Sequence, residues 1–264
     1  MHTNIQIVAT IGPASKDKET LHNMVDAGMS LARLNFSWGT HEEHASFAAA
    51  VREIAAQKEM RIPILQDLSG PRIQEGSGHT YDPAASVITE KDRFDLAFAA
   101  RVMPEYIALS FVRNAADVAQ LRALCVEQGI AAKIIAKIER QEALEDIDAI
   151  IAEADGIMVA RGDLGEAIPF QEVPFVQKEI LARCKKALKP SIVATEMLTS
   201  MISKEQPSRA DVSDIAHAVL DGASATMLSN ETAIGMYPIE TVSVMRIVLD
   251  EAASRTEDIA EARF

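Results

Sequence analysis

Four polar residues that could act together in chemistry each follow a short apolar run of the chain. Lys137 and Glu139 end one such run, Asp163 follows a second, and Thr195 follows a third. An apolar, β-branched run is typical of a buried parallel strand, and in a β/α barrel the side chains at the carboxyl ends of the strands meet at one mouth. We therefore expect the four residues to lie together. One ammonium, two carboxylates and a hydroxyl suit a divalent cation that holds an anionic oxygen ligand.

Eight strand-like apolar runs alternate with segments of helical period, an arrangement that would bring these residues together. The runs span 5–9, 31–34, 63–67, 106–109, 133–137, 156–160, 191–194 and 225–228. Helices are expected between them, notably at 42–57, 114–127, 170–187 and 208–220. Strict alternation of eight strands with helices predicts an α/β fold in which the strands close into a single (β/α)8 barrel of the TIM type.

One segment breaks this rhythm. Residues 74–89 include Gly76, Gly78 and Pro83 and have no clear periodicity. We expect a loop after the third strand, because fewer than about 40 residues rarely bury enough surface to fold alone. The charged segment 254–264 is expected to be a helix end that frays. The whole chain, 1–264, is therefore predicted to be one barrel domain.

The charge balance argues against one class of function. The formal net charge is −13 at pH 7, whereas nucleic-acid binding needs clustered Lys and Arg that release counterions from the phosphates. We therefore expect no nucleic-acid partner. An acidic exterior still allows a positive pocket, for which the candidates are Arg33, Arg72, Lys137, Arg161 and Arg209.

The cysteines and the apolar runs indicate a cellular setting. Cys125 and Cys184 are the only cysteines, and each lies in a segment expected to be helical, so we expect packing residues rather than a disulfide or a metal site. No apolar run approaches the roughly 18 residues of a membrane span, and residues 1–4 lack a signal-peptide pattern. A reducing cytoplasm and no membrane partner are therefore expected.

Further motifs, taken with the runs that precede the four polar residues, resemble the pyruvate kinase family. In chain order the motifs are TIGPAS at 10–15, ARLNFS at 32–37, QDLSGP at 66–71, ALSFVR at 108–113, IIAKIE at 134–139, GIMVARGD at 156–163, SIVAT at 191–195, PSRA at 207–210 and LDG at 220–222. They occur in order and at barrel spacing over nearly the whole chain. The resemblance implies the barrel domain of a pyruvate kinase.

The resemblance does not extend to the other domains of the family. Pyruvate kinases usually insert a mobile β-rich lid between the third strand and the third helix, where this chain has only residues 74–89. We therefore expect the lid to be absent. Members also usually carry a carboxyl-terminal regulatory domain, whereas this sequence ends soon after the eighth expected helix. Control by sugar phosphates is accordingly not expected.

The resemblance implies a role for each polar residue at the mouth. Glu139 and Asp163 match the carboxylates that hold the essential Mg²⁺ or Mn²⁺, ions that prefer hard oxygen donors. Lys137 matches the lysine that stabilises the transferring phosphoryl group and the enolate oxygen, Arg33 the arginine that grips phosphate, and Thr195 the threonine near the carbon that gains a proton. The alternative is that the carboxylates merely begin helices, where the helix dipole favours them, and that the lysine lies in solvent.

The turn at Gly162 and Asp163 is matched to substrate binding. In the resembling family, the backbone amides at this position receive the substrate carboxylate at the start of a helix. A Gly-Asp turn without the flanking motifs would be weak evidence.

A potassium site is implied by a second set of oxygen donors. Asn35, Ser37, Asp67 and the carbonyl of Leu68 match the family's potassium ligands, although the same residue types also serve as helix caps. Arg72 stands where potassium-dependent members have glutamate, and members with a basic residue there can dispense with the ion. The sequence leaves both outcomes open.

The nucleotide half of the site agrees less well with the family. Arg33 and Asn35 match its nucleotide-binding residues. In contrast, Trp38 stands where the family has a histidine, Ser69 replaces a lysine and Gln74 replaces an arginine. Trp38 is expected to cover a loop rather than to stack on an adenine.

His41 and His44 have helical spacing after the second strand, which raises the question of a zinc pair. Acidic residues lie between them and no third imidazole is near in the sequence. We therefore expect a solvated helix start and no zinc.

Three functional hypotheses follow. The first is a minimal pyruvate kinase that transfers a phosphoryl group between phosphoenolpyruvate and ADP, giving pyruvate and ATP. The second keeps the metal-bound enolate without the nucleotide, as in a 2-oxo-acid aldolase or oxaloacetate decarboxylase. The third is a catalytically silent phosphoenolpyruvate binder, against which the joint presence of all four polar residues argues. The resemblance implies barrel-to-barrel contacts of a homo-oligomer, but the sequence leaves the oligomeric state open.

Overall fold

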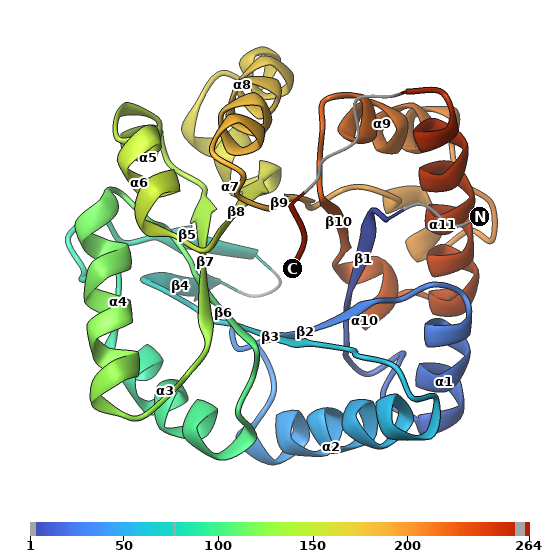
Figure 1. The fold of residues 1–264 in the computed structure, drawn as a ribbon, viewed down its shortest axis with the longest axis horizontal. Coiled ribbons are helices and arrows are strands. Elements are labelled where there is room, and N and C mark those ends of the chain that lie inside the picture. The colour runs from blue at the N-terminus through green and yellow to red at the C-terminus, as the bar shows by residue number, and fades with distance from the viewer. Residues whose placement is uncertain (1–3, 76–77, 257–261) are drawn as a thin grey trace.

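Eight parallel strands close into a barrel, and helices surround it (Figure 1). The structure is a computed structural model and describes residues 4–75, 78–256 and 262–264. The barrel strands are β1 (Gln6–Thr10), β2 (Leu31–Asn35), β3 (Ile64–Asp67), β6 (Tyr106–Leu109), β7 (Lys133–Ile138), β8 (Gly156–Ala160), β9 (Ser191–Ala194) and β10 (Ala225–Leu228). Each strand pairs with the next in this order, and β10 closes the ring by pairing with β1. The predicted single (β/α)8 barrel is confirmed.

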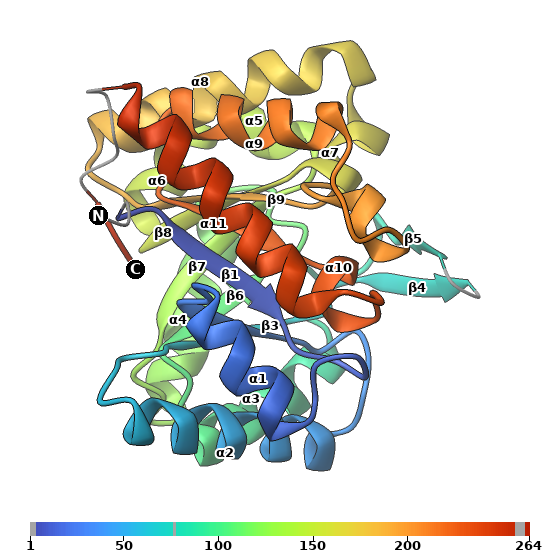
Figure 2. The same ribbon diagram turned by 90° about the vertical axis from the view of Figure 1, so that its right-hand side faces the viewer.

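The helices form the outer layer of the barrel (Figure 2). They are α1 (Lys18–Asp26), α2 (His41–Gln57), α3 (Glu90–Val102), α4 (Ala115–Glu127), α5 (Gln141–Glu145), α6 (Ile147–Glu153), α7 (Arg161–Ala167), α8 (Val173–Lys186), α9 (Arg209–Leu220), α10 (Asn230–Ala233) and α11 (Pro238–Ser254), with short 3₁₀ turns at Phe170–Glu172 and Thr199–Ile202. Capping boxes at Thr40, Thr89 and Ser208 begin α2, α3 and α9, because each side chain accepts a hydrogen bond from an otherwise unpaired helical amide. Among the described helices, none has the length and apolar character needed to cross a bilayer.

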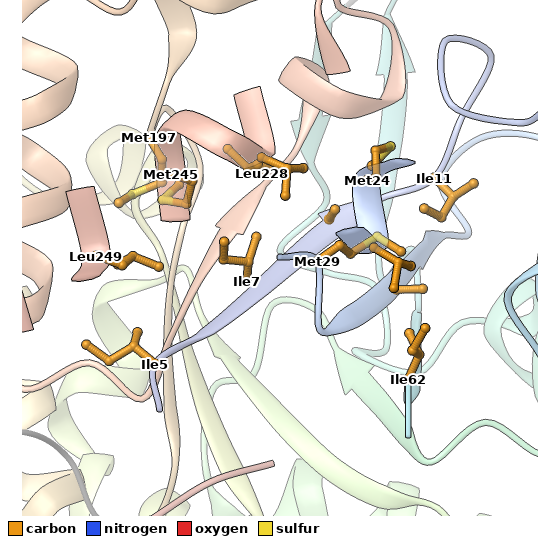
Figure 3. Close-up of a cluster of buried hydrophobic side chains, with 14 of the residues drawn as sticks. Ile5, Ile7, Ile11, Met24, Met29, Ile62, Met197, Leu228, Met245 and Leu249 are labelled. Atoms are coloured by element: carbon orange, nitrogen blue, oxygen red, sulfur yellow. The ribbon is translucent and has the colours of Figure 1, made fainter. Parts of the chain in front are cut away.

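Alternate residues of each strand face two different parts of the core. In β1, Val8 points into the barrel interior, whereas Ile7 and Ala9 pack outward against helices. Ile7 shares its cluster with Met245 and Leu249 of α11 (Figure 3). Because both faces of the strands are buried, the runs are largely apolar rather than alternating, as the sequence pattern indicates.

The expectation of a loop at 74–89 was wrong in its first half. Strands β4 (Arg72–Glu75) and β5 (Gly78–Tyr81) form an antiparallel hairpin that projects from one end of the barrel (Figure 2). Arg72 pairs with Tyr81 across the hairpin. Each strand has only four residues, too few for periodicity to reveal it. Gly76 lies outside the described residues.

The end of the chain also departs from expectation. Helix α11 ends at Ser254, residues 257–261 lie outside the described part, and Phe264 is buried at the end of the barrel opposite the strands' carboxyl ends. Its ring lies 5.5 Å from that of Tyr106, centroid to centroid, and its backbone N–H donates to Gln6 Oε1 at 3.0 Å. An apolar ring that fills the barrel end stabilises this segment, so the prediction that all of 254–264 frays was wrong.

Candidate active site

Lys137 lies at the centre of a buried polar cluster near the carboxyl end of β7. Its Nζ donates to Ser110 Oγ at 2.6 Å and lies 3.1 Å from Asp67 Oδ1 and 3.0 Å from Glu139 Oε1. Only 4% of the residue is exposed. Burial lowers the pKa of Lys137, but the charges of Asp67 and Glu139 outweigh it and raise the pKa above its ordinary value. The lysine is therefore a fixed cation, and the alternative of a solvent-exposed lysine is wrong.

Glu139 follows β7 directly and is fully buried. Its Oε2 accepts a hydrogen bond from the Phe111 N–H at 2.6 Å, and a left-handed backbone at Phe111, φ 56°, accompanies this contact. Its Oε1 forms the 3.0 Å ion pair with Lys137 Nζ. Burial raises the pKa of Glu139 to about 7, because the attraction of Lys137 only partly offsets it.

Asp163 lies in the first turn of α7 and faces the hairpin. Its Oδ1 lies 2.6 Å from His79 Nε2, and its Oδ2 lies 3.7 Å from an Arg72 nitrogen. Burial raises the pKa of Asp163, but the charge of Lys137, followed by Arg72 and His79, outweighs it and brings the pKa below the ordinary value. Asp163 therefore stays ionised next to the Lys137 cluster.

Arg33 reaches the same cluster from β2. Its Nε donates to Asp67 Oδ2 at 2.7 Å, and its Nη1 donates to Thr10 Oγ1 at 2.9 Å. Burial raises the pKa of Asp67, but Lys137 and Arg33 together outweigh it and lower the pKa. Arg33 is thus held in one orientation before any ligand arrives.

The residues matched to a potassium site make other contacts. Both Asp67 oxygens face cations, and the Leu68 carbonyl accepts from Ser110 Oγ at 2.7 Å. Asn35 Oδ1 accepts from the Ser37 N–H at 3.2 Å, which fixes a turn after β2. The alternative that these residues cap a helix is wrong, because Thr40 is the cap of α2.

Thr195 follows β9 in an unusual conformation. Its φ is 72°, which is strained for a β-branched residue. Two contacts hold it: its Oγ1 accepts from the Gly162 N–H at 2.8 Å, and its carbonyl accepts from Arg161 Nη2 at 2.7 Å. The Gly162 amide, matched to the substrate carboxylate, therefore donates to Thr195 in this state.

The structure thus gathers Lys137, Glu139, Asp67 and Arg33 in one cluster and joins Thr195 to Gly162, next to Asp163. It also adds partners that the sequence reasoning missed. Ser110 and the Phe111 amide lie within a motif, so their position after β6 was a usable signal. His79 was not predicted, because nothing in the periodicity of 74–89 indicates where a hairpin would point.

The two histidines after β2 are not solvated, contrary to expectation. His41 Nε2 lies 2.8 Å from Asp95 Oδ1 of α3. His44 is buried and stacks on Phe36, with 4.2 Å between ring centroids. The partners, Asp95 and Phe36, lie outside α2, so the helical spacing of the two histidines could not predict these contacts. Trp38 remains half exposed.

Cys125 and Cys184 are buried packing residues, as predicted. Burial raises the pKa of the Cys125 thiol to about 11 and that of Cys184 to about 12, so neither is a reactive thiolate at neutral pH.

Comparison with known proteins places this geometry in a family. The family model described as the barrel domain of pyruvate kinase matches residues 2–84 and 76–242. The chain belongs to the pyruvate kinase family. A pyruvate kinase of Geobacillus stearothermophilus is 37% identical over 100% of this chain and 58% of the relative. One from Sporosarcina psychrophila is 37% identical over 94% of this chain and 57% of the relative. One from Thermococcus litoralis is 35% identical over 98% of this chain and 72% of the relative.

The chain spans little more than half the length of the first two pyruvate kinases. The Geobacillus match covers 347 aligned positions and this chain has 264 residues, so at least 83 positions of that relative have no counterpart here. The two segments matched by the family model overlap at 76–84, a stretch that includes β5 of the hairpin.

The buried carboxylates suit a divalent cation. Glu139 Oε1 is a hard oxygen donor that is shielded from water and lies 3.0 Å from the Lys137 ammonium. Within the same residues, no three His, Cys, Asp or Glu side chains gather closely enough to form a complete metal site. Two protein carboxylates fit Mg²⁺, which usually takes its remaining ligands from water and substrate.

Proposed function

We propose that this protein is a metal-dependent phosphotransferase of the pyruvate kinase type, transferring a phosphoryl group between phosphoenolpyruvate and ADP. The observation that carries the proposal is the buried cluster in which Lys137 lies between Asp67 and Glu139, two carboxylates that are almost completely removed from solvent. Membership of the pyruvate kinase family supports it. A cytoplasmic setting follows from this reaction.

Glu139 and Asp163 would hold Mg²⁺ or Mn²⁺. When bound, the cation would neutralise charge on the phosphoryl and enolate oxygens. Glu139, whose pKa is raised, would have to lose its proton to bind the cation, whereas Asp163 is already ionised.

The charge balance of the cluster favours an anionic substrate. With Glu139 ionised, as metal binding requires, its charged groups are Asp67, Glu139, Asp163, Arg33, Lys137 and Arg72. These three carboxylates and three cations cancel, so a bound divalent cation leaves the site positive. A phosphorylated carboxylic acid restores neutrality, whereas a neutral substrate would leave the excess charge buried.

Lys137 and Arg33 act on the transferring group. Their positions are fixed by hydrogen bonds to Ser110 and Thr10, so little reorganisation is needed when charge develops on the phosphoryl and enolate oxygens. Arg33 and Asn35 would face the nucleotide phosphates, with the fixed fork of the guanidinium suited to them. Thr195 would orient the proton delivered to the methylene carbon. The Asp163 amide would receive the substrate carboxylate, and the Gly162 amide would join it by giving up its hydrogen bond to Thr195 Oγ1.

We do not expect potassium to be required. Both oxygens of Asp67 already face cations, and Arg72 adds a permanent positive charge at this side of the site. The positive charge that potassium would bring is thus already provided by protein side chains.

A coupled assay tests the proposal. ATP and pyruvate are followed from phosphoenolpyruvate and ADP with Mn²⁺, with and without potassium, and with Lys137→Met as the inactive control. Activity that is lost in the variant and indifferent to potassium supports the proposal. No ATP at high concentrations of both substrates would refute the kinase.

A second candidate keeps the enolate chemistry without the nucleotide. It is favoured by the at least 83 positions of the Geobacillus relative that have no counterpart here, and by Ser69 and Gln74, which stand where the resembling family has a lysine and an arginine. Such a lyase would exchange the methyl protons of pyruvate with solvent deuterium, in a reaction that needs metal and Lys137. Exchange without ATP formation would support the lyase, and phosphoenolpyruvate binding with neither would support a silent binder.

A further inference from the structure

The β4–β5 hairpin carries a side chain into the candidate active site. His79 of β5 places Nε2 2.6 Å from Asp163 Oδ1, and its side chain is only 22% exposed. A carboxylate oxygen accepts, so in this hydrogen bond the imidazole donates from Nε2. No motif of the barrel accounts for this contact, because His79 lies on the hairpin, outside the barrel strands.

Side-chain packing of the hairpin holds His79 in this position. Tyr81 stacks on Phe111 with ring centroids 5.0 Å apart, and the Arg140 guanidinium lies 4.3 Å from the Tyr81 ring centroid. The rings of His79 and Phe111 are arranged edge to face, with 6.4 Å between their centroids. Phe111 is the residue whose N–H binds Glu139. One buried ring therefore ties the hairpin to the same segment that holds the first carboxylate.

We propose that His79 is a positioning residue that orients the Asp163 carboxylate for a divalent cation, an inference that rests on the metal site of the proposed function. A carboxylate oxygen has two lone pairs, so Oδ1 can accept from His79 and still bind an ion. Holding a ligating carboxylate by a second hydrogen bond fixes its rotation and lowers the cost of ordering it on binding. Arg72, at 3.7 Å from Oδ2, is too distant for a hydrogen bond and contributes charge without fixing direction.

Competition between His79 and the cation for Asp163 would have the opposite effect on metal affinity. If His79 competed with the ion for Asp163, removing the imidazole would tighten metal binding. If His79 orients the carboxylate, removing it weakens binding, and a side chain that keeps an N–H donor at the same reach restores it. The sign of the change separates the two.

The experiment measures Mn²⁺ affinity directly, from the loss of the free-ion electron paramagnetic resonance signal. It compares the wild-type protein with His79→Phe and His79→Gln, and uses His22→Gln as the matched control. His22 also contacts a carboxylate, Asp26 at 3.2 Å, but lies on α1 and is exposed. Circular dichroism establishes that each variant is folded.

We expect His79→Phe to bind Mn²⁺ roughly 10- to 100-fold more weakly, His79→Gln to recover most of the loss through its amide N–H, and His22→Gln to match the wild type. Unchanged or tighter binding in both His79 variants would overturn the inference while leaving the metal site intact. A wild-type protein that binds no Mn²⁺ would instead overturn the metal site of the proposed function, and the inference with it.

Discussion

Lys137 Nζ lies 3.0 Å from Glu139 Oε1, and both side chains are almost completely removed from solvent. An ion pair at this distance would ordinarily lower the pKa of the carboxyl group, yet burial raises the pKa of Glu139 to about 7. The cost of burying the carboxylate therefore exceeds the attraction of the lysine. Without a second cation, the ionised form of Glu139 is therefore unfavourable near neutral pH.

This state should make the stability of the metal-free protein depend on pH. The folded protein holds the Glu139 proton up to about pH 7, whereas the unfolded chain releases it near the ordinary value of 4.5. The native state thus binds more protons in this window, so its free energy of unfolding falls as pH rises through the window. Asp67 and Asp163 have lowered pKa values, so their contributions change below this window.

Urea unfolding of metal-free protein at several pH values between roughly 5 and 8 measures the effect. In Glu139→Gln the fall should be much smaller, because no proton is gained or lost at this position. Equal slopes in the wild type and the variant would show that Glu139 is not the group responsible.

Metal binding should release a proton below neutral pH. Glu139 must lose its proton to bind an ion, and its pKa of about 7 leaves it largely protonated at roughly pH 6. Titration calorimetry with Mn²⁺ in two buffers of different ionisation enthalpy measures the released protons. We expect up to about one proton per ion at low pH and almost none well above pH 7. Heats that do not depend on the buffer at low pH would contradict this assignment.

Replacing Lys137 should remove most of the activity. Lys137→Met keeps an unbranched side chain of nearly the same length but leaves developing negative charge without its fixed cation, so we expect kcat to fall by roughly 10²- to 10³-fold. Lys178→Met is the matched control, because Lys178 is exposed and lies 3.9 Å from Asp221. A folded Lys137→Met protein with near wild-type kcat would exclude the lysine from the reaction.

Arg161 should support proton delivery through Thr195. It pairs with Asp214 at 2.6 Å and donates to the carbonyl of Thr195, whose strained φ of 72° depends on such support. In Arg161→Met we expect Thr195 to relax and exchange of pyruvate methyl protons to slow by up to roughly 100-fold. Arg183→Met, at an exposed arginine, is the control. Wild-type exchange in folded Arg161→Met would show that Thr195 keeps its place unaided.

The sequence predicted the barrel closely because its strands are buried on both faces. The runs at 106–109, 156–160, 191–194 and 225–228 coincide with β6, β8, β9 and β10. Polar residues placed directly after such strands must meet at one end, which is why Lys137, Glu139, Asp163 and Thr195 could be grouped.

The hairpin and several side-chain contacts of the site could not be predicted, because they depend on residues far apart in the sequence. The hairpin at 72–81 consists of two very short strands, and the direction of His79 follows from Tyr81 stacking on Phe111 rather than from its own neighbours. Likewise, His41 has the spacing of a solvated helix start, yet it pairs with Asp95 of another helix. The sequence also gave no sign that both oxygens of Asp67 would already face cations.

Phosphorus magnetic resonance of a single reaction mixture tests the central claim most directly. Wild-type protein with Mg²⁺, phosphoenolpyruvate and ADP should convert the phosphoenolpyruvate signal into the γ-phosphate signal of ATP in equal amount, and Lys137→Met should leave it almost unchanged. Loss of phosphoenolpyruvate to inorganic phosphate alone, or no conversion by folded protein that binds Mn²⁺, would contradict phosphoryl transfer to a nucleotide at this site.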